Sequence, residues 1–267
     1  MISFGSDNHA GAHPEVLAAI AAANTGTAPA YGTDEWTLRA RDRLRALFAC
    51  PQMEVLFTFS GTGANVLSLA CALQPWEAAL CSDVAHLHVD EACAPERLLG
   101  CKIVPVPSRD GKITPADLSP ALAWLGDHHH PQAGLLSLTQ ATEYGTAYQL
   151  SELRALRDVA RAHGLRVHLD GARLANAAVA LDVELPALLE ASGADVVSLG
   201  GTKNGLLYGE AVLLTRPQPR GLLAMGARRQ PGLRGLRQPP ASTDTRADSG
   251  SRSARPPPPG SGASIGP

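Results

Sequence analysis

Three short segments of the sequence carry residue types that do chemistry in proteins, and each follows a run of apolar residues. The segment 60–65, Ser-Gly-Thr-Gly-Ala-Asn, opens a helical pattern, so its backbone N–H groups could bind an anion such as a phosphate. The segment 170–173, Asp-Gly-Ala-Arg, offers a carboxylate that could pair with a protonated ring nitrogen or a metal ion. The segment 200–205 places Lys203 among glycines, where a desolvated amine can attack an aldehyde to form a Schiff base.

Each of these segments also has an ordinary structural explanation when it is taken alone. A glycine-rich turn often serves geometry only, and segment 60–65 is neither a GxGxxG nor a P-loop motif. Asp170 could simply cap the following helix, and Lys203 could be a solvated loop residue. His168, two residues before Asp170, fits a buried histidine with satisfied hydrogen bonds.

Taken together, the three segments favour a single chemistry. A phosphate cradle, a carboxylate for a ring nitrogen and a lysine for an aldehyde are what a protein must supply to pyridoxal 5'-phosphate. The chain has only three lysines, and Lys102 and Lys112 are explained by a strand start and a turn. The order of the segments, with Asp170 and then Lys203 after the phosphate loop, also fits the fold-type I enzymes that use this cofactor.

Alternating apolar runs and amphipathic stretches in residues 1–215 predict an α/β fold, with a mostly parallel sheet and helices on both faces. The strands are expected at 55–59, 79–81, 102–106, 134–138, 165–169, 195–199 and 210–214. The helices are expected at 63–73, near 115–125, and at 151–163, 172–181 and 186–191. Each of the three segments therefore follows a strand, and ligands of such folds bind outside the carboxyl ends of the strands.

The charge of the chain changes sign at about residue 215. The whole chain has 267 residues and a formal net charge of −2. Residues 216–267 contain nine arginines, two aspartates, ten prolines and no aromatic residue, which gives +7, so residues 1–215 carry −9. A segment this poor in apolar residues cannot offset its ordering entropy by burial, so we expect a low-complexity, disordered tail.

The tail admits three explanations. It could be an arginine-rich arm for nucleic acid, a docking segment around Pro256–Pro259, or GC-rich DNA translated out of frame. The abrupt loss of helix and strand patterns after Leu214 favours a shifted or truncated reading frame. Nucleic-acid binding fits poorly with the acidic remainder and with a tail that has no aromatic residue to stack on bases.

Other features of the sequence argue against a membrane or secreted protein. No apolar run approaches the roughly 18 residues that a membrane span needs, and residues 1–10 lack the pattern of a secretory signal. The five cysteines are odd in number and show no CxxC spacing, which is typical of reduced thiols. We therefore expect a soluble, cytoplasmic protein.

Six stretches of the sequence recur, in this order, in one family. They are Ser6–Pro14, Tyr31–Asp34, Ser60–Asn65, Ala85–Glu91, His168–Leu174 and Gly201–Gly205. Through them the chain resembles the low-specificity L-threonine aldolases of the β-eliminating lyase superfamily, from about Ile2 to Leu214. The resemblance implies a fold-type I, aminotransferase-like large domain and cleavage of L-threonine or L-allo-threonine to glycine and acetaldehyde. It also implies homotetramers built as dimers of dimers.

The resemblance further implies roles for individual residues. Lys203 would hold the cofactor as a Schiff base, and Asp170 would keep its pyridine nitrogen protonated. His86 would stack on the ring and help to remove the proton of the substrate's β-hydroxyl group. Arg173 would hold the substrate carboxylate or the 3'-oxygen of the cofactor, and Ser6 would assist at the carboxylate.

Three further positions receive an assignment by the same resemblance. Gly61 and Thr62 would hold the phosphate, and Glu91 is a candidate near His86. The triplet His128-His129-His130 is assigned no metal, because successive side chains diverge in a regular strand or helix.

The sequence departs from the family after Leu214. Intact relatives continue with a small domain that carries arginines for the substrate carboxylate and for a neighbouring subunit's phosphate, and residues 216–267 do not match it. We therefore expect a cofactor-binding large domain with its N-terminal segment at 1–215, and a tail in place of the small domain. The hypotheses are a threonine aldolase or an inactive, truncated cofactor-binding remnant, and we expect little aldolase activity from the chain as written.

Overall fold

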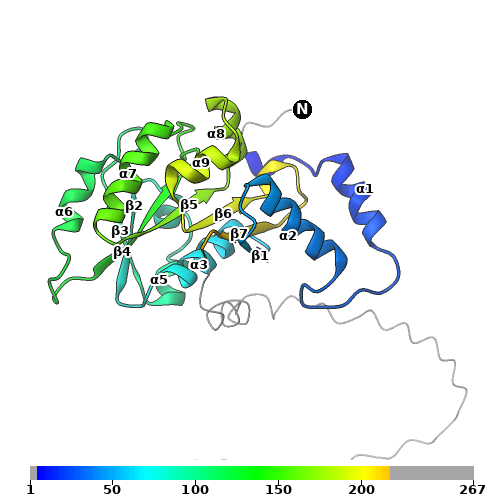
Figure 1. Cartoon of the computed structure of the whole chain (residues 1–267), viewed down its shortest axis with the longest axis horizontal. Helices are drawn as coiled ribbons and strands as arrows, with labels where there is room; N and C mark the ends of the chain where they lie inside the picture. Colours follow the sequence, from blue (N-terminus) through cyan, green and yellow to red (C-terminus); the bar gives the residue numbers. More distant parts are fainter. Residues whose placement is uncertain (1–4, 217–267) are drawn as a thin grey trace, which may run out of the picture. The chain divides into compact units, whose positions relative to one another are not determined.

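A mixed sheet of seven strands organises the part of the chain, residues 5–216, that the computed structural model describes (Figure 1). The strands are β1 (Glu54–Thr58), β2 (Glu77–Ser82), β3 (Lys102–Val106), β4 (Gln132–Thr139), β5 (Arg166–Gly171), β6 (Val196–Gly200) and β7 (Glu210–Leu214). Their order across the sheet is β1-β7-β6-β5-β4-β2-β3. Of these seven strands, β7 alone runs in the opposite direction, antiparallel to β1 and β6 on either side of it. The expected mostly parallel sheet is therefore confirmed.

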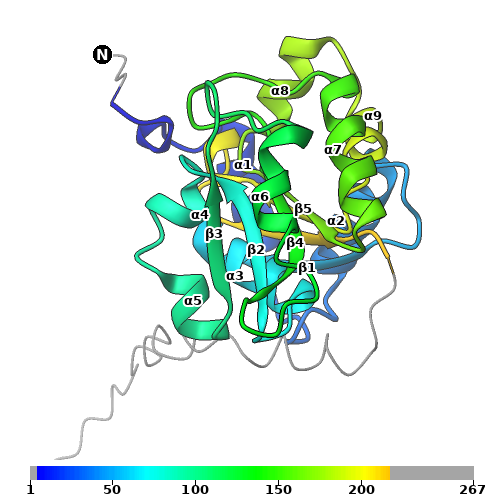
Figure 2. The same cartoon turned by 90° about the vertical axis from the view of Figure 1, so that its left-hand side faces the viewer.

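Helices cover both faces of this sheet, as the sequence predicts (Figures 1 and 2). They are α1 (Pro14–Ala23), α2 (Glu35–Leu47), α3 (Gly61–Ala72), α4 (His86–Val89), α5 (Ala94–Leu99), α6 (Ser119–Leu122), α7 (Leu150–Ala162), α8 (Leu174–Leu181) and α9 (Leu185–Ser192). Helix α3 packs on one face against β6 and β7, next to α5. Helices α7, α8 and α9 pack on the opposite face, where α7 and α8 contact β5.

The alternation of side chains along each strand creates two separate hydrophobic cores, one on each face of the sheet. On one face, Val167 and Leu169 of β5 pack with Leu153 of α7. On the other face, Val196 of β6 packs with Leu67 of α3. Because Val167 and Leu169 face α7, the residue between them and the residue after them face α3, where the polar residues of the site lie.

The core beneath α7 gives a direct stability prediction. Leu153 has no exposed surface, so replacing it with alanine should leave a cavity that lowers the free energy of unfolding by about 3 kcal/mol. Urea denaturation of the two chains would measure this change. Val179 of α8 is 83% exposed, so Val179→Ala is the matched control and should change the free energy by less than ~0.5 kcal/mol. Equal losses in both variants would contradict this account of the core.

Several elements differ from the prediction for identifiable reasons. The helix expected near 115–125 is a 3-10 turn, Pro115–Leu118, followed by the four residues of α6. Helices α4 and α5 were not predicted because four and six residues are too short to show a helical period. Helix α1 was missed because none of its residues is buried, so it has no distinct buried face.

The predicted tail at 216–267 falls almost entirely outside the described residues. Arg216 is described, and its Nε lies 2.9 Å from Asp195 Oδ1. The expectations for 217–267, on disorder, reading frame and a docking segment, therefore stay predictions. Within residues 5–216, no helix is both long enough and apolar enough to span a membrane.

Candidate active site

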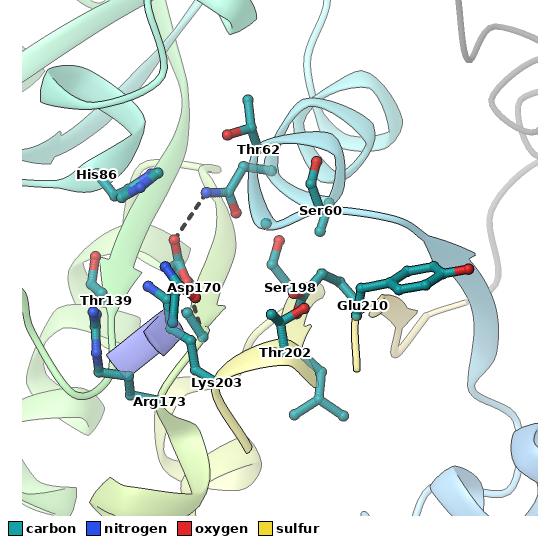
Figure 3. Close-up of a pocket in the computed structure, with 18 of the residues that line it drawn as sticks. Ser60, Thr62, His86, Thr139, Asp170, Arg173, Ser198, Thr202, Lys203 and Glu210 are labelled. Carbon is teal, nitrogen blue, oxygen red and sulfur yellow. Dashed lines mark hydrogen bonds between the residues drawn. The ribbon is translucent and has the colours of Figure 1, made fainter. Parts of the chain in front are cut away.

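A cavity of about 300 Å³ lies at the carboxyl ends of β1, β5 and β6, and its wall includes residues from all three sequence segments (Figure 3). Gly61 and Thr62 come from the start of α3, Asp170 from the end of β5 and Lys203 from the turn after β6. His86, the first residue of α4, also lines the cavity. The three segments thus lie together at the strand ends, around one cavity.

Asp170 is the second-last residue of β5. Because side chains alternate between the two faces of a strand, its side chain points toward α3. Its carboxylate is 5% exposed, and Oδ2 accepts a hydrogen bond from Asn65 Nδ2 at 2.9 Å (Figure 3). Its Oδ1 accepts the N–H of Ala172 at 3.0 Å. The N-cap of α8 is Arg173, so the alternative that Asp170 caps this helix is wrong.

Asn65 links Asp170 to a second buried carboxylate. The same Nδ2 donates to Glu91 Oε1 at 2.7 Å, and this oxygen also lies 2.9 Å from His86 Nδ1. The hydrogen bond from His86 to Glu91 raises the pKa of the imidazole, burial opposes this, and the negative charges of Glu91 and Asp170 add to the increase. The histidine therefore holds its proton to a higher pH than an ordinary imidazole. The sequence placed Glu91 near His86 but gave Asn65 no role.

Asp7 pairs with the cationic residues of the cavity. It belongs to the stretch Ser6–Pro14, but the sequence predicts no role for it. Arg173 donates to Asp7 through Nε at 2.6 Å and Nη2 at 3.3 Å, and Lys203 Nζ lies 3.9 Å from Asp7 Oδ1. Burial acts to raise the pKa of Asp7, but the hydrogen bond and charge of Arg173 and the charge of Lys203 outweigh it and lower the pKa. An ionised Asp7 thus holds Arg173 at the rim of the cavity.

Two glycines after β6 allow the chain to pass close to the start of α8. A side-chain carbon at Gly200 would lie 2.5 Å from the carbonyl oxygen of Ala172, and one at Gly201 would collide with the carbonyl oxygen of Gly209. Only glycine fits these approaches without movement of the backbone. They bring the turn that carries Lys203 against the end of β5.

The first turn of α3 presents backbone donors to the cavity. Ser60 caps the helix, and its Oγ accepts the N–H of Gly63 at 3.1 Å. The N–H groups of Gly61 and Thr62 have no hydrogen-bond acceptor among residues 5–216. A side-chain carbon at Gly61 would meet nothing within 4 Å, so the approach to these donors is open. The helix start is therefore suited to an anion.

Ser6 is placed differently from the other expected site residues. Its Oγ accepts the N–H of Asn8 at 3.1 Å and caps the 3-10 turn Asp7–His9. Asn8 lines the cavity, whereas Ser6 does not. The structure thus brings the Ser6 segment to the site without placing the Ser6 side chain in the cavity wall.

Glu143 is a cavity residue that the sequence analysis missed. It lies in the loop after β4, and its Oε1 accepts the backbone N–H of His86 at 2.8 Å and the Thr139 hydroxyl at 3.1 Å. The signal that could have revealed it is its position, because it follows the carboxyl end of β4.

His168 is a buried histidine with satisfied hydrogen bonds, as predicted. It has no exposed surface, and its Nδ1 and Nε2 each lie 2.9 Å from a serine hydroxyl, those of Ser137 and Ser198. Burial lowers the pKa of His168 to about 4, against a smaller opposing effect of the Asp170 charge. The ring is therefore neutral and ties β4, β5 and β6 together.

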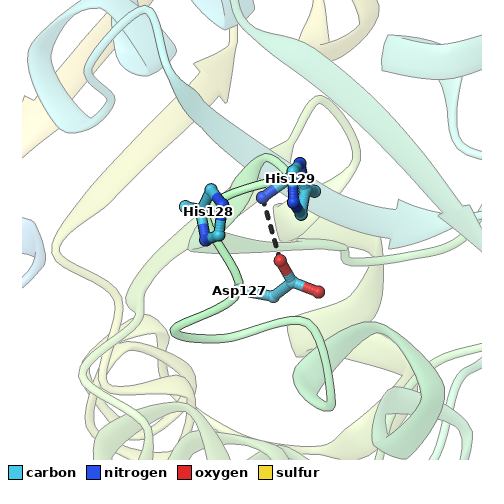
Figure 4. A group of neighbouring side chains, drawn as sticks. All are labelled: Asp127, His128 and His129. Carbon is cyan, nitrogen blue, oxygen red and sulfur yellow. Dashed lines mark hydrogen bonds between the residues drawn. The ribbon is translucent and has the colours of Figure 1, made fainter.

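The histidine triplet lies away from the cavity, between α6 and β4 (Figure 4). Ligand atoms of Asp127, His128 and His129 lie within 4.8 Å of one another, and all three side chains are exposed. His130 instead stacks on Trp124, with ring centroids 5.0 Å apart. Because these residues form a turn, the argument that adjacent side chains diverge does not apply to His128 and His129. The absence of a metal here stays a prediction.

Comparison with solved structures defines the class of protein. The threonine aldolase of Leishmania major superposes with a TM-score of 0.78 and 32% identity, over 85% of this chain and 67% of that one. Mouse CSAD shares the fold, with a TM-score of 0.59 at 21% identity. The fold is that of the fold-type I enzymes.

The sequence profile of the Beta-eliminating lyase family matches residues 3–231, and the chain belongs to this family. It is 44% identical over 211 residues to the low specificity L-threonine aldolase of Pseudomonas aeruginosa, and 42% identical to that of a further Pseudomonas strain. The matched residues make up 79% of this chain and 61% of each relative, so the chain spans less than two thirds of their length.

Proposed function

We propose that this chain is the cofactor-binding part of a lyase of the threonine aldolase type. It binds pyridoxal 5'-phosphate and cleaves the Cα–Cβ bond of L-threonine or L-allo-threonine to give glycine and acetaldehyde. The observation that carries this proposal is the meeting of a helix start, a buried carboxylate and a lysine in one cavity. The 44% identity to a low specificity L-threonine aldolase supports the choice of reaction.

The residues present fit this cofactor. The unpaired N–H groups of Gly61 and Thr62 suit its phosphate, and the carboxylate of Asp170 suits its ring nitrogen. Lys203 offers the amine for its aldehyde. His86 lines the same cavity and is assigned to the ring face.

In the reaction, each residue binds, orients or holds a proton. When bound, the cofactor supplies a protonated aromatic ring over which negative charge at the substrate's Cα is delocalised. Asp170, fixed by Asn65 and Ala172, keeps the proton on the ring nitrogen. Arg173, held by Asp7, binds the substrate carboxylate, with Ser6 assisting from the adjacent turn.

The setting and assembly of the protein are part of the same proposal. We assign residues 1–215 to the large domain and 216–267 to a low-complexity tail. All five cysteines are free thiols, which supports a reducing, cytoplasmic setting. We assign assembly as dimers of dimers to intact relatives by resemblance, and Leu17 and Ile20 of α1 are about half exposed, which leaves apolar surface for a partner subunit.

The test is to add pyridoxal phosphate to the 267-residue chain, record the visible absorption and measure acetaldehyde released from L-threonine. We expect a new absorption band that borohydride fixes covalently, with little release of acetaldehyde compared with a full-length relative. A band without acetaldehyde would favour the alternative, an inactive cofactor-binding remnant. The absence of both the absorption band and acetaldehyde would exclude both the aldolase and the cofactor-binding remnant. Salt-dependent retardation of labelled DNA would favour the nucleic-acid hypothesis, the least favoured of the alternatives.

A further inference from the structure

Glu143 is a carboxylate of the cavity that the assignments above leave without a role. It lines the cavity together with His86, Asp170 and Lys203. Its Oε1 is held by two donors, the backbone N–H of His86 at 2.8 Å and the Thr139 hydroxyl at 3.1 Å. Its Oε2 is buried and has no hydrogen-bond partner among the described residues. The side chain is therefore fixed at one oxygen and unsatisfied at the other.

This oxygen differs from those of the other carboxylates of the site. Both oxygens of Asp170 accept N–H groups, Glu210 Oε2 accepts the N–H of Gly201 at 2.7 Å, and Asp7 pairs with Arg173. Within residues 5–216, Glu143 Oε2 is thus the buried carboxylate oxygen of the cavity wall that lacks a donor. A buried acceptor without a donor destabilises a fold, so a ligand that brings a donor is the simplest explanation for it.

His86, the other acid–base group nearby, is already engaged by Glu91 at one ring nitrogen. Its Nδ1 lies 2.9 Å from Glu91 Oε1, and this hydrogen bond raises the pKa of the imidazole. The charged form of the ring has no free lone pair, so below its pKa His86 cannot accept a further proton. Glu143 Oε2 offers the cavity a second acceptor.

We propose that Glu143 Oε2 accepts the proton of the substrate's β-hydroxyl group. This inference rests on the proposed function. The O–H bond breaks and its proton moves to Oε2, while the electron pair of that bond forms the second bond of the acetaldehyde carbonyl group. The Cα–Cβ bond breaks and its electron pair stays with Cα, and a proton delivered to Cα completes glycine.

The surroundings of Glu143 support this assignment. Burial raises the pKa of the carboxyl group and the charge of Asp170 adds to the increase, whereas the N–H of His86 and the Thr139 hydroxyl oppose it. Cys81 and Tyr148 are the other titratable groups that the charge of Glu143 influences. Both are neutral, because burial raises the pKa of the Cys81 thiol to about 12 and raises the pKa of the Tyr148 hydroxyl well above its usual range. A raised carboxyl pKa moves a general base toward the neutral range, where proton transfer is most effective.

The linkage between this pKa and stability gives a test that needs no cofactor. A pKa higher in the folded than in the unfolded chain contributes stability at low pH, which is lost as the pH rises through the folded value. Wild type should therefore lose stability relative to Glu143→Gln as the pH rises from about 4 to 8. In carboxyl 13C NMR, the Glu143 signal should titrate above the ordinary glutamate range. A signal that titrates within that range would overturn the proposal.

The second test uses the full chain loaded with pyridoxal phosphate, in excess over L-threonine, so that one turnover is followed. Glu143→Gln should release acetaldehyde about 100-fold more slowly, because the amide cannot take a proton. The control is Glu96→Gln, because Glu96 Oε2 is also buried and unpaired but does not line the cavity. This control should keep the wild-type rate within about twofold, because surface or distant changes leave transition-state contacts intact.

The outcomes of the second test separate the two proposals. L-Threonine should shift the Glu143 carboxyl signal, and L-2-aminobutyrate, which lacks the hydroxyl group, should not. Equal shifts with both ligands, or a wild-type rate in Glu143→Gln, would overturn the role of Glu143 and leave the proposed function standing. Failure of wild type and Glu96→Gln alike to cleave L-threonine would overturn the proposed function, and the inference with it.

Discussion

Replacing Lys203 with alanine is expected to abolish the covalent attachment of pyridoxal phosphate. Lys203 is the lysine that lines the cavity, and its amine lies 3.9 Å from Asp7. It lies in the turn after β6, the strand next to β5, which carries Asp170. An alanine cannot form the bond to the aldehyde carbon, so cofactor could bind only through its phosphate and ring. The measurement is the visible absorption band, with mass spectrometry of the borohydride-treated chain.

The other two lysines provide matched controls for this experiment. Lys112 pairs with Glu152 at 2.8 Å, and Lys102 begins the edge strand β3, so neither lines the cavity. Lys102→Ala and Lys112→Ala should keep both the band and the mass increase. If Lys203→Ala also kept an adduct that borohydride fixes, another amine would be the point of attachment and the assignment would fail.

The strand ends of the site could be predicted from the sequence because the signals are local. Asp170 directly follows the strand pattern 165–169, and Lys203 follows Gly200 and Gly201 after the strand pattern 195–199, so the change from strand to glycine-containing turn marks their position. The rule that parallel strands gather their carboxyl ends at one edge then brings them together without any knowledge of contacts. The same rule applied to β4 would have identified Glu143.

The contacts that orient these residues could not be predicted in this way, because they join distant parts of the chain. The hydrogen bond from Arg173 to Asp7 spans 166 positions, and that from Asn65 to Asp170 spans 105. No periodicity or spacing encodes such pairs, since they arise only when separate elements pack. Asn65 is a large polar residue in a helix of otherwise apolar and small residues. Because a buried amide needs hydrogen-bond partners, its presence there was the available sign of a polar partner on another element.

Replacing Asp170 with asparagine is expected to slow any retro-aldol cleavage by at least about 100-fold, which corresponds to ~3 kcal/mol in the barrier. The substitution keeps the size of the side chain and removes the negative charge that holds a proton on the ring nitrogen. The oxygen of the amide can still accept the N–H of Ala172, but the amide NH2 then faces Asn65 Nδ2 and that hydrogen bond is lost. The rate of acetaldehyde release and the amount of bound cofactor would be measured on the same sample.

A second buried aspartate separates loss of chemistry from loss of stability. Asp195 is 8% exposed, its Oδ2 accepts the N–H of Val167 at 2.9 Å, and it does not line the cavity. Asp195→Asn should therefore lower the unfolding midpoint while leaving the rate per bound cofactor unchanged. Asp170→Asn should instead lower the rate per bound cofactor, whatever its effect on the unfolding midpoint, because it removes the charge at the cavity. Unchanged turnover in Asp170→Asn would show that the carboxylate serves only the backbone turn at Ala172.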